Sequence, residues 1–313
     1  MTSRELAIAR SVIYASLFDY PLTLEQLRRA LIESDQTAAE ILAVFDGSAL
    51  LQQMIEYRDG FFFPAGRRDL VAERFRREAR SRDFLRRHER LLRVLCALPF
   101  TRLVALSGSI AHMNLESTGD LDLFIVTRGR RVWTVTVAVL LVAKLLRCRR
   151  VVCANFVMAD THLRLEQQDL FTANQVISLR PLIGAELWDG FLAANPFVAR
   201  LYPNAVARPA GFDAVGDRGP AARGHLKRLL EILLSLPSPI VESICRRLYA
   251  WHLRRKAGSW RSPDQVSLRS DYLKLHTQSH RRSVLDRFDA AVESAIRQAE
   301  HQLAPRAVAG GRR

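Results

Sequence analysis

Apolar and polar residues alternate at helical spacing in three short segments at the start of the chain. These segments are Arg4–Phe18, Thr23–Ile32 and Thr37–Phe45. Apolar residues three or four positions apart lie on one face of a helix, so each segment is predicted to be an amphipathic helix. Thr23 and Gln26, directly after Pro21, have the spacing of a capping box. The chain is therefore expected to begin with three helices separated by turns.

Two strands are predicted next, Leu50–Tyr57 and Gly60–Pro64, because Asp59-Gly60 is a strong hairpin signal between them. Three helices followed by a hairpin resemble the winged-helix family in architecture. Around the third helix, where a DNA-reading protein places basic side chains, the chain has Asp35, Glu40 and Asp46 but no arginine. This favours a structural or protein-docking role over DNA reading, although nucleic acid stays open as a partner.

Arginine dominates the segment Arg67–Arg93, which has eleven arginines and five acidic residues. Its apolar residues recur at close to helical spacing, so a long amphipathic connecting helix is predicted. One interpretation is a solvated face with internal ion pairs such as Glu73 with Arg77 and Glu89 with Arg93. The other is a basic wall beside a nucleotide or RNA site.

After Pro99 the periodicity changes to that of strands. The elements expected are strands at Leu103–Leu106, Asp120–Thr127 and Arg150–Met158, with a helix at Val132–Leu146 before the last of them. A helix of this length can cross over between parallel strands, which predicts an α/β sheet with a covered face. The same apolar helix is shorter than the roughly 20 residues of a bilayer span, so no transmembrane span is expected. Its ends are both basic, which leaves a peripheral membrane role as a minor alternative.

The remainder of the chain is predicted to be mainly helical. Helices are expected near Leu170–Leu179, Gly184–Ala194 and within Ala221–Gln302, with a linker at Pro203–Pro220 and a frayed tail from Val308. The predicted organisation is a winged-helix-like domain at 1–66, a connecting helix at 67–98, a core at 99–202, a linker at 203–220 and a helical region at 221–313.

Composition excludes a disordered tail, a collagen and a coiled coil, because 49% of the residues are hydrophobic and 25% are charged. The formal charge of +15 favours polyanionic partners such as nucleic acid, nucleotides or an anionic membrane face. Only four of the 47 basic residues are lysines, and codon composition explains that excess of arginine equally well. The four cysteines form no CxxC pair and no leader peptide is apparent, so buried thiols in the cytoplasm are expected.

Candidate chemistry concentrates between Leu103 and Val126. Gly108-Ser109 follows a hydrophobic strand, and Asp120-Leu121-Asp122 opens the next one. Side chains two positions apart lie on the same face of a strand, so both carboxylates can converge on one or two divalent ions. The Gly-Ser turn can offer backbone N–H groups and a hydroxyl to phosphate oxygens. Phosphoryl chemistry requires both of these parts.

This stretch resembles the nucleotidyltransferase superfamily, which includes DNA polymerase β, antibiotic nucleotidyltransferases and minimal nucleotidyltransferases. The signature is a hydrophobic residue before Gly-Ser, a spacer of about ten residues, and D-x-D in a strand. The resemblance covers about Phe100–Met158, and Gly119 and the apolar Leu123–Val126 agree with it. It implies an α/β (α+β) core with a mixed sheet, preceded here by the winged-helix-like region and followed by a helical one.

The resemblance also implies roles for individual residues. Asp120 and Asp122 would ligate Mg²⁺ or Mn²⁺, and Gly108 and Ser109 would hold the β- and γ-phosphates of a nucleoside triphosphate, with ATP the first choice. An acceptor hydroxyl would then attack the α-phosphate and expel pyrophosphate. Nothing in the sequence identifies the acceptor.

Two departures from the family pattern stand out. His112 occupies a place where relatives often have arginine, so cationic assistance would require its protonation. Relatives usually carry a third carboxylate on the next strand, but Val151–Met158 offers only Asn155, which cannot take up a proton at neutral pH. Asp160 and Glu166, just beyond that strand, are the alternative bases.

Two functions follow. One is an enzyme that transfers a nucleoside monophosphate, and the other is a catalytically weakened nucleotide- or RNA-binding module of the same fold, whose winged-helix-like region mediates assembly. Further phosphate contacts could come from a C-terminal helix, although such a face is usually only solvated. The residues are His276, His280, Arg281 and Arg282.

Overall fold

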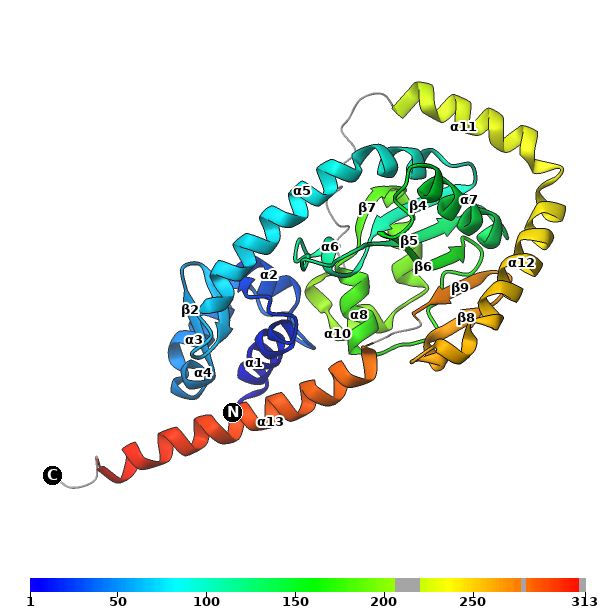
Figure 1. Cartoon of the computed structure of the whole chain (residues 1–313). Helices are drawn as coiled ribbons and strands as arrows, with labels where there is room; N and C mark the ends of the chain where they lie inside the picture. Colours follow the sequence, from blue (N-terminus) through cyan, green and yellow to red (C-terminus); the bar gives the residue numbers. More distant parts are fainter. Residues whose placement is uncertain (206–219, 277–279, 310–313) are drawn as a thin grey trace.

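The computed structural model describes residues 1–205, 220–276 and 280–309 of the chain (Figure 1). Most of the predicted linker Pro203–Pro220 lies outside the described residues, and so do 310–313 of the predicted frayed tail. Residues 308 and 309 belong to the last helix.

The N-terminal region contains the three predicted helices, α1 (Ser3–Ser16), α2 (Leu24–Arg29) and α3 (Ala38–Gly47). Each begins after a threonine whose side chain accepts a hydrogen bond from the third residue of the helix, and a Glu or Gln there completes a capping box. The strands β1 (Leu22–Thr23), β2 (Ile55–Arg58) and β3 (Phe61–Pro64) form a three-stranded antiparallel sheet in the order β1-β3-β2.

The first predicted strand of the hairpin begins later than expected. Residues Ala49–Met54 form helix α4, and the strand starts only at Ile55. The Ser48 side chain accepts a hydrogen bond from the backbone N–H of Leu51, which begins the helix. Leu51 and Met54 are three positions apart and both are buried, which is the helical period rather than the strand period.

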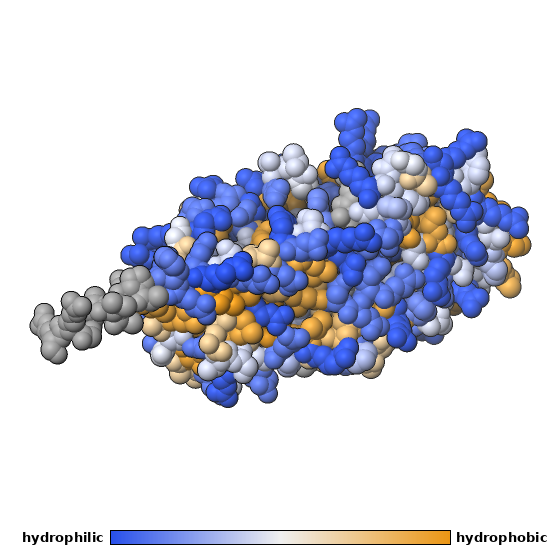
Figure 2. Space-filling model, turned by 90° about the horizontal axis from the view of Figure 1, so that it is seen from below, coloured by the Kyte–Doolittle hydropathy of each residue, from blue (hydrophilic) through white to orange (hydrophobic). Residues whose placement is uncertain are grey.

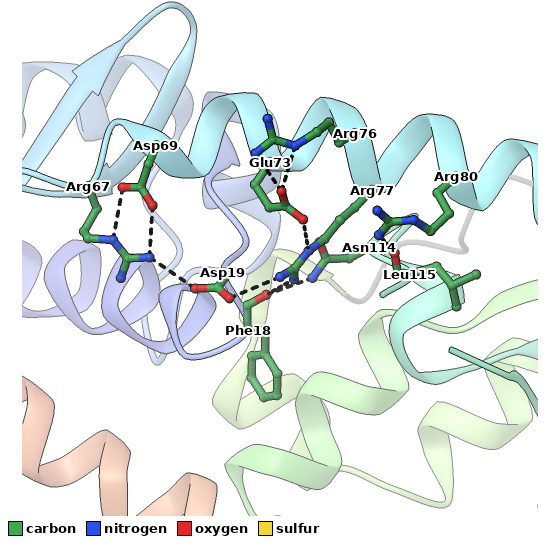
Figure 3. Close-up of polar contacts among 10 residues, drawn as sticks. All are labelled: Phe18, Asp19, Arg67, Asp69, Glu73, Arg76, Arg77, Arg80, Asn114 and Leu115. Carbon is green, nitrogen blue, oxygen red and sulfur yellow. Dashed lines mark hydrogen bonds and ion pairs between the residues drawn. The ribbon is translucent and has the colours of Figure 1, made fainter. Parts of the chain in front are cut away.

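The arginine-rich segment forms the long helix α5 (Asp69–Ala97), which runs from the N-terminal sheet to the large sheet (Figure 1). Both predicted ion pairs are present, Glu73 with Arg77 at 2.9 Å and Glu89 with Arg93 at 3.2 Å. Arg77 also reaches Asp19 at 3.2 Å, as Figure 3 shows. Much of the positive charge of α5 is therefore neutralised by pairs on the helix or used to fasten it to the rest of the chain.

The larger sheet has six strands in the order β7-β4-β5-β6-β9-β8. Its strands are β4 (Thr101–Leu106), β5 (Leu121–Thr127), β6 (Val152–Ala159), β7 (Arg180–Ile183), β8 (Val266–Leu268) and β9 (Tyr272–Leu275).

 Strand β6 spans Val152–Ala159. The pair β5–β6 is parallel and is joined by the crossover helix α7 (Val132–Leu145), while the other pairs are antiparallel. The predicted strands, the crossover helix and a mixed α/β sheet are confirmed.

Three strands arise where only helices were predicted. Strand β7 lies in the segment beyond Asp169, and β8 and β9 lie within Ala221–Gln302. Each is three or four residues long. Strands β7 and β8 form the two edges of the sheet, and β9 lies between β6 and β8. Pairing with neighbouring strands, rather than a pattern of their own, decides their conformation. The region 221–313 is consequently not a separate helical unit, since it supplies two strands of the sheet.

The remaining helices surround the sheet. They are α8 (Leu170–Ile177), α9 (Trp188–Ala193), α10 (Phe197–Leu201), α11 (Pro220–Ser235), α12 (Ser238–Arg255) and α13 (Arg281–Ala309). Helix α12 packs on α7, and α13 runs back along the N-terminal region (Figure 1). There the Phe288 ring meets the Tyr14 ring edge-on with centroids 5.2 Å apart, so the two ends of the chain share one core. Within the described residues, no helix has the length and apolar character needed to cross a bilayer.

Candidate functional site

The two aspartates lie where strand β5 begins. Asp120 precedes the strand and Asp122 is its second residue. Because β5 and β6 are parallel and Asp122 pairs with Cys153, the beginning of β6 lies beside them. The Cys153 thiol donates to Asp120 Oδ2 at 2.8 Å, and the Asn155 amide donates to Asp122 Oδ1 at 2.5 Å. One end of two adjacent strands therefore gathers two carboxylates, a thiol and an amide.

The turn after β4 closes directly over this group. The backbone N–H of Ser107 donates to the carbonyl oxygen of Asp122 at 3.0 Å. Gly108 has φ +62°, and a Cβ atom at this position would overlap Asp122 Oδ2. The Asp122 carboxylate thus lies against the backbone of the Gly108-Ser109 turn, an approach that only glycine allows. The short helix α6 (Gly108–Ala111) follows.

A cavity of about 980 Å³ opens in front of the aspartates. This volume lies near the upper end of the roughly 300–1,000 Å³ typical of small-molecule sites. The residues predicted from the sequence that line it are Gly108, Ser109, His112, Asp120, Asp122 and Asn155. Other parts of its lining come from α1, α2 and α8, and from the residues on either side of 277–279. The N-terminal region therefore covers a site whose chemistry belongs to the sheet.

Positively charged and aromatic side chains also line the cavity. Arg29 and Arg180 line it together with Tyr20 and Phe156. Burial lowers the pKa of both arginines, yet their usual pKa is so high that they stay charged at neutral pH. The cavity lining consequently contains both carboxylates and guanidinium groups.

Burial, followed by the charge of the neighbouring Asp120, raises the pKa of Asp122 to about 7, although the Asn155 hydrogen bond acts in the opposite direction. Burial, followed by the hydrogen bond to Asp120, also raises the pKa of the Cys153 thiol. Two carboxylates in this position repel each other, and a bound cation would relieve that repulsion.

The donor set fits a divalent metal ion. One ligand atom each from Asp120, Asp122 and Cys153 lie within 4.8 Å of one another. Carboxylate oxygens are the donors that Mg²⁺ and Mn²⁺ prefer, whereas a thiol suits softer ions. These three residues could together hold a metal ion.

His112 lines the same cavity and packs against an aromatic ring. Its ring meets the Tyr20 ring with centroids 5.4 Å apart. Burial, followed by the charges of Arg180 and Arg74, lowers the pKa of His112 to about 4. The imidazole is therefore neutral at pH 7, which does not fit the cationic role considered for His112; the arginines that line the cavity, Arg29 and Arg180, are charged.

The two carboxylates considered as alternative bases do not reach the pair. Asp160 follows the far end of β6, where it accepts a hydrogen bond from Gly129 N–H at 2.8 Å and pairs with Arg102 at 3.0 Å. Glu166 lies near Arg269, 3.6 Å away. Neither residue lines the described cavity, so of the three candidates for the third position only Asn155 contacts the aspartates.

Of the four C-terminal candidates for phosphate contacts, two line the cavity and two form ion pairs with aspartates. His276 follows β9 instead of lying in a helix, and both His276 and His280 line the cavity. Burial, followed by the charge of Lys274, lowers the pKa of His276 to about 4. Arg281 pairs with Asp169, and Arg282 pairs with Asp264 at 3.2 Å.

Sequence reasoning missed Cys153, Arg180 and Arg29 as site residues. The position of Cys153 could have been predicted from the sequence. It is two positions from Asn155 in a predicted strand, so both side chains lie on the same face of that strand. Arg29 and Arg180 carry no such signal, because α2 and β7 meet at the cavity only through tertiary packing.

Comparisons with known proteins identify no relative: no protein-family model matches the chain, and no significant match exists among curated proteins or solved structures. The function of the chain is therefore inferred from the residues of the site.

Proposed function

We propose that this chain is a divalent-metal-dependent nucleotidyltransferase that moves a nucleoside monophosphate from a nucleoside triphosphate to an acceptor hydroxyl. One observation carries the proposal: the carboxylates of Asp120 and Asp122 lie close together in the lining of a nucleotide-sized cavity, with Asp122 against the Gly-Ser turn. The mixed sheet agrees with the core that the superfamily resemblance implies.

In this proposal Asp120 and Asp122 hold Mg²⁺ or Mn²⁺. The ion, when bound, neutralises negative charge on the transferring phosphoryl group. The backbone and hydroxyl of Ser109 bind phosphate oxygens, and Arg180, which lines the same cavity, balances their negative charge. Asn155 orients Asp122 through its amide. The acceptor oxygen forms a bond to the α-phosphorus, the bond to the bridging oxygen breaks, and pyrophosphate leaves.

A nucleotide- or RNA-binding module is the second candidate, and one observation favours it. Cys153 and Asn155 occupy the face of β6 that meets the aspartates, and neither an amide nor a thiol of raised pKa accepts a proton at neutral pH. Loss of a general base typically slows a reaction by about 10²- to 10⁴-fold without abolishing substrate binding. In either case, we propose that the winged-helix-like N-terminal region closes the site and docks a protein partner.

Pyrophosphate release from ATP, CTP, GTP and UTP tests the enzyme proposal. With Mg²⁺ or Mn²⁺ present, at least one triphosphate is expected to release pyrophosphate when a mixture of candidate acceptors is supplied. Chelation with EDTA is expected to stop the release. Nucleotide binding without release under any of these conditions would support the binding module instead.

Replacing Asn155 with aspartate is expected to raise turnover by about 10-fold or more, because it adds a carboxylate that can accept the acceptor proton. The matched control is Asn155→Ala, which removes the amide without adding an acid and is expected to give no gain. The measurement is the rate of pyrophosphate release between about pH 6 and pH 9. A binding module would bind nucleotide in all three proteins and turn over in none.

A further inference from the structure

Helices α11 and α12 expose an extended apolar surface, here called the hairpin face. Its members are Leu226, Leu229, Leu230, Ile232, Leu233, Leu234, Leu236, Ile240, Val241, Ile244, Leu248 and Trp251. Apolar side chains reach the surface at the right-hand end of Figure 2, the side on which Figure 1 places α12. An exposed apolar patch of this extent marks an interaction surface rather than ordinary surface scatter.

Polar contacts hold both helices of the hairpin face to the body. Lys227 on α11 donates to the backbone oxygen of Thr101 at 2.6 Å, and Glu231 accepts from the backbone N–H of Phe100 at 2.8 Å. On α12, Glu242 accepts from the backbone N–H groups of Trp133 and Thr134, next to the buried Ala250 and Leu253 of the same helix. Most surface helices bury their apolar side, so the inward polar contacts of α11 reverse the usual arrangement and leave its leucines exposed.

Basic residues border the hairpin face. Residues 220–256 contain eight basic residues and two acidic ones, and both acidic residues, Glu231 and Glu242, are engaged on the inner side. Arg246, Arg247 and Arg254 are exposed on α12. The Arg255 guanidinium lies 3.7 Å from the centre of the exposed Trp251 ring. Arginine and tryptophan beside exposed leucine are the combination that suits the boundary between lipid headgroups and acyl chains.

We infer that the hairpin face docks on an anionic lipid surface, with α11 and α12 lying in the plane of the interface. The apolar side chains enter the boundary of the acyl chains, and the arginines along the border pair with anionic headgroups. The inward contacts of Lys227, Glu231 and Glu242 hold both helices to the body, so docking requires no refolding. This inference does not depend on the proposed function of the cavity.

Charge complementarity favours lipid over a second copy of the chain. A twofold interface would place the same patch on both sides, so the arginine border of one copy would face that of the other. Repulsion between these charges opposes such a dimer, whereas an anionic surface attracts them. The second copy is therefore an outcome of the test rather than the proposal.

Co-flotation of the full chain with vesicles tests the inference. Binding is expected to phosphatidylcholine vesicles that contain about 30% phosphatidylserine, and much more weakly to phosphatidylcholine alone. Three of the most exposed apolar residues, Leu236, Ile240 and Leu248, are 88%, 66% and 65% exposed. Changing all three to serine is expected to weaken binding by at least about 30-fold. The pair Arg247→Gln and Arg254→Gln is expected to weaken it by about 20-fold and to reduce its salt dependence.

The matched control changes exposed aromatic residues far from the hairpin, Tyr57→Ser with Phe75→Ser, and is expected to bind like the original chain. Circular dichroism and melting temperature verify that every variant is folded. Absence of vesicle binding by the original chain would overturn the inference. So would equal binding by the triple-serine variant, or a dimer that the triple change dissociates while vesicles remain unbound. None of these readouts involves a nucleotide, so they are independent of the cavity's proposed activity.

Discussion

Replacing Asp122 with asparagine is expected to reduce metal-dependent pyrophosphate release by about 10²- to 10⁴-fold and, at the same time, to stabilise the ion-free protein at pH 8. The first effect follows from losing one of the two carboxylates that would hold the ion. The second follows from removing a buried charge that is repelled by Asp120. Replacing a residue with a purely structural role would not be expected to lower pyrophosphate release and raise stability at the same time.

The sign of the stability effect comes from the pKa of Asp122, which is about 7 in the fold and has an ordinary value of 3.8. A raised pKa means that the ionised carboxyl is disfavoured in the folded state. The penalty is absent below the ordinary pKa, grows as the pH rises between the two values, and is complete above the folded pKa. Asp122→Asn is therefore expected to raise the free energy of unfolding by roughly 1–3 kcal/mol at pH 8 and by little at pH 4.

Urea unfolding at both pH values, with EDTA and then with Mg²⁺, measures this difference. Added Mg²⁺ is expected to stabilise the original chain more than the variant, because the variant lacks one ligand. The exposed Asp46 provides a charge-matched control, and Asp46→Asn is expected to change neither stability nor pyrophosphate release. If Asp122→Asn changed neither the free energy of unfolding nor the rate of pyrophosphate release, the aspartate pair would not be part of the active site.

Replacing Gly108 with alanine is expected to eliminate metal binding and to lower pyrophosphate release by at least about 100-fold, because a misplaced reacting geometry alone can cost that much. The added Cβ would overlap Asp122 Oδ2, so the carboxylate has to leave its position against the turn. The left-handed backbone at φ +62° adds a strain of about 1–2 kcal/mol.

Gly60 separates the two causes. It has φ +83°, but a Cβ at this position meets nothing within 4 Å. Gly60→Ala is therefore expected to have the strain without the overlap, losing about 1–2 kcal/mol of stability and no activity. Calorimetric titration with Mn²⁺ and the pyrophosphate assay compare the two variants. Metal binding by Gly108→Ala equal to that by Gly60→Ala would contradict the placement of Asp122 against the turn.

Local rules predicted much of this molecule. The threonines that begin α1, α2 and α3 each form the capping box that their spacing allows. Strands β4, β5 and β6 and the crossover helix α7 follow from periodicity alone. Side chains two positions apart lie on the same face of a strand. This rule predicted that Asp120 and Asp122 lie together, and it would also have predicted that Cys153 lies beside Asn155.

Longer-range relations escaped prediction for specific reasons. Asp160 is close to β6 in sequence, but the parallel direction of β5 and β6 places it at the opposite strand end from the aspartates. The strands β7, β8 and β9 are too short to show a period of their own. The hairpin face resembles an ordinary helical region in sequence, since only the buried contacts of Lys227 and Glu231 show which side is inward.

The sequence by itself determined the elements and the pair of carboxylates, because helix caps, strand alternation and turns act between residues only a few positions apart. The tertiary structure alone decided which groups share the cavity, the protonation of His112 and Asp122, and the outward direction of the leucines on α11 and α12. Burial and the charge of distant neighbours control these properties, and both depend on how separate segments pack.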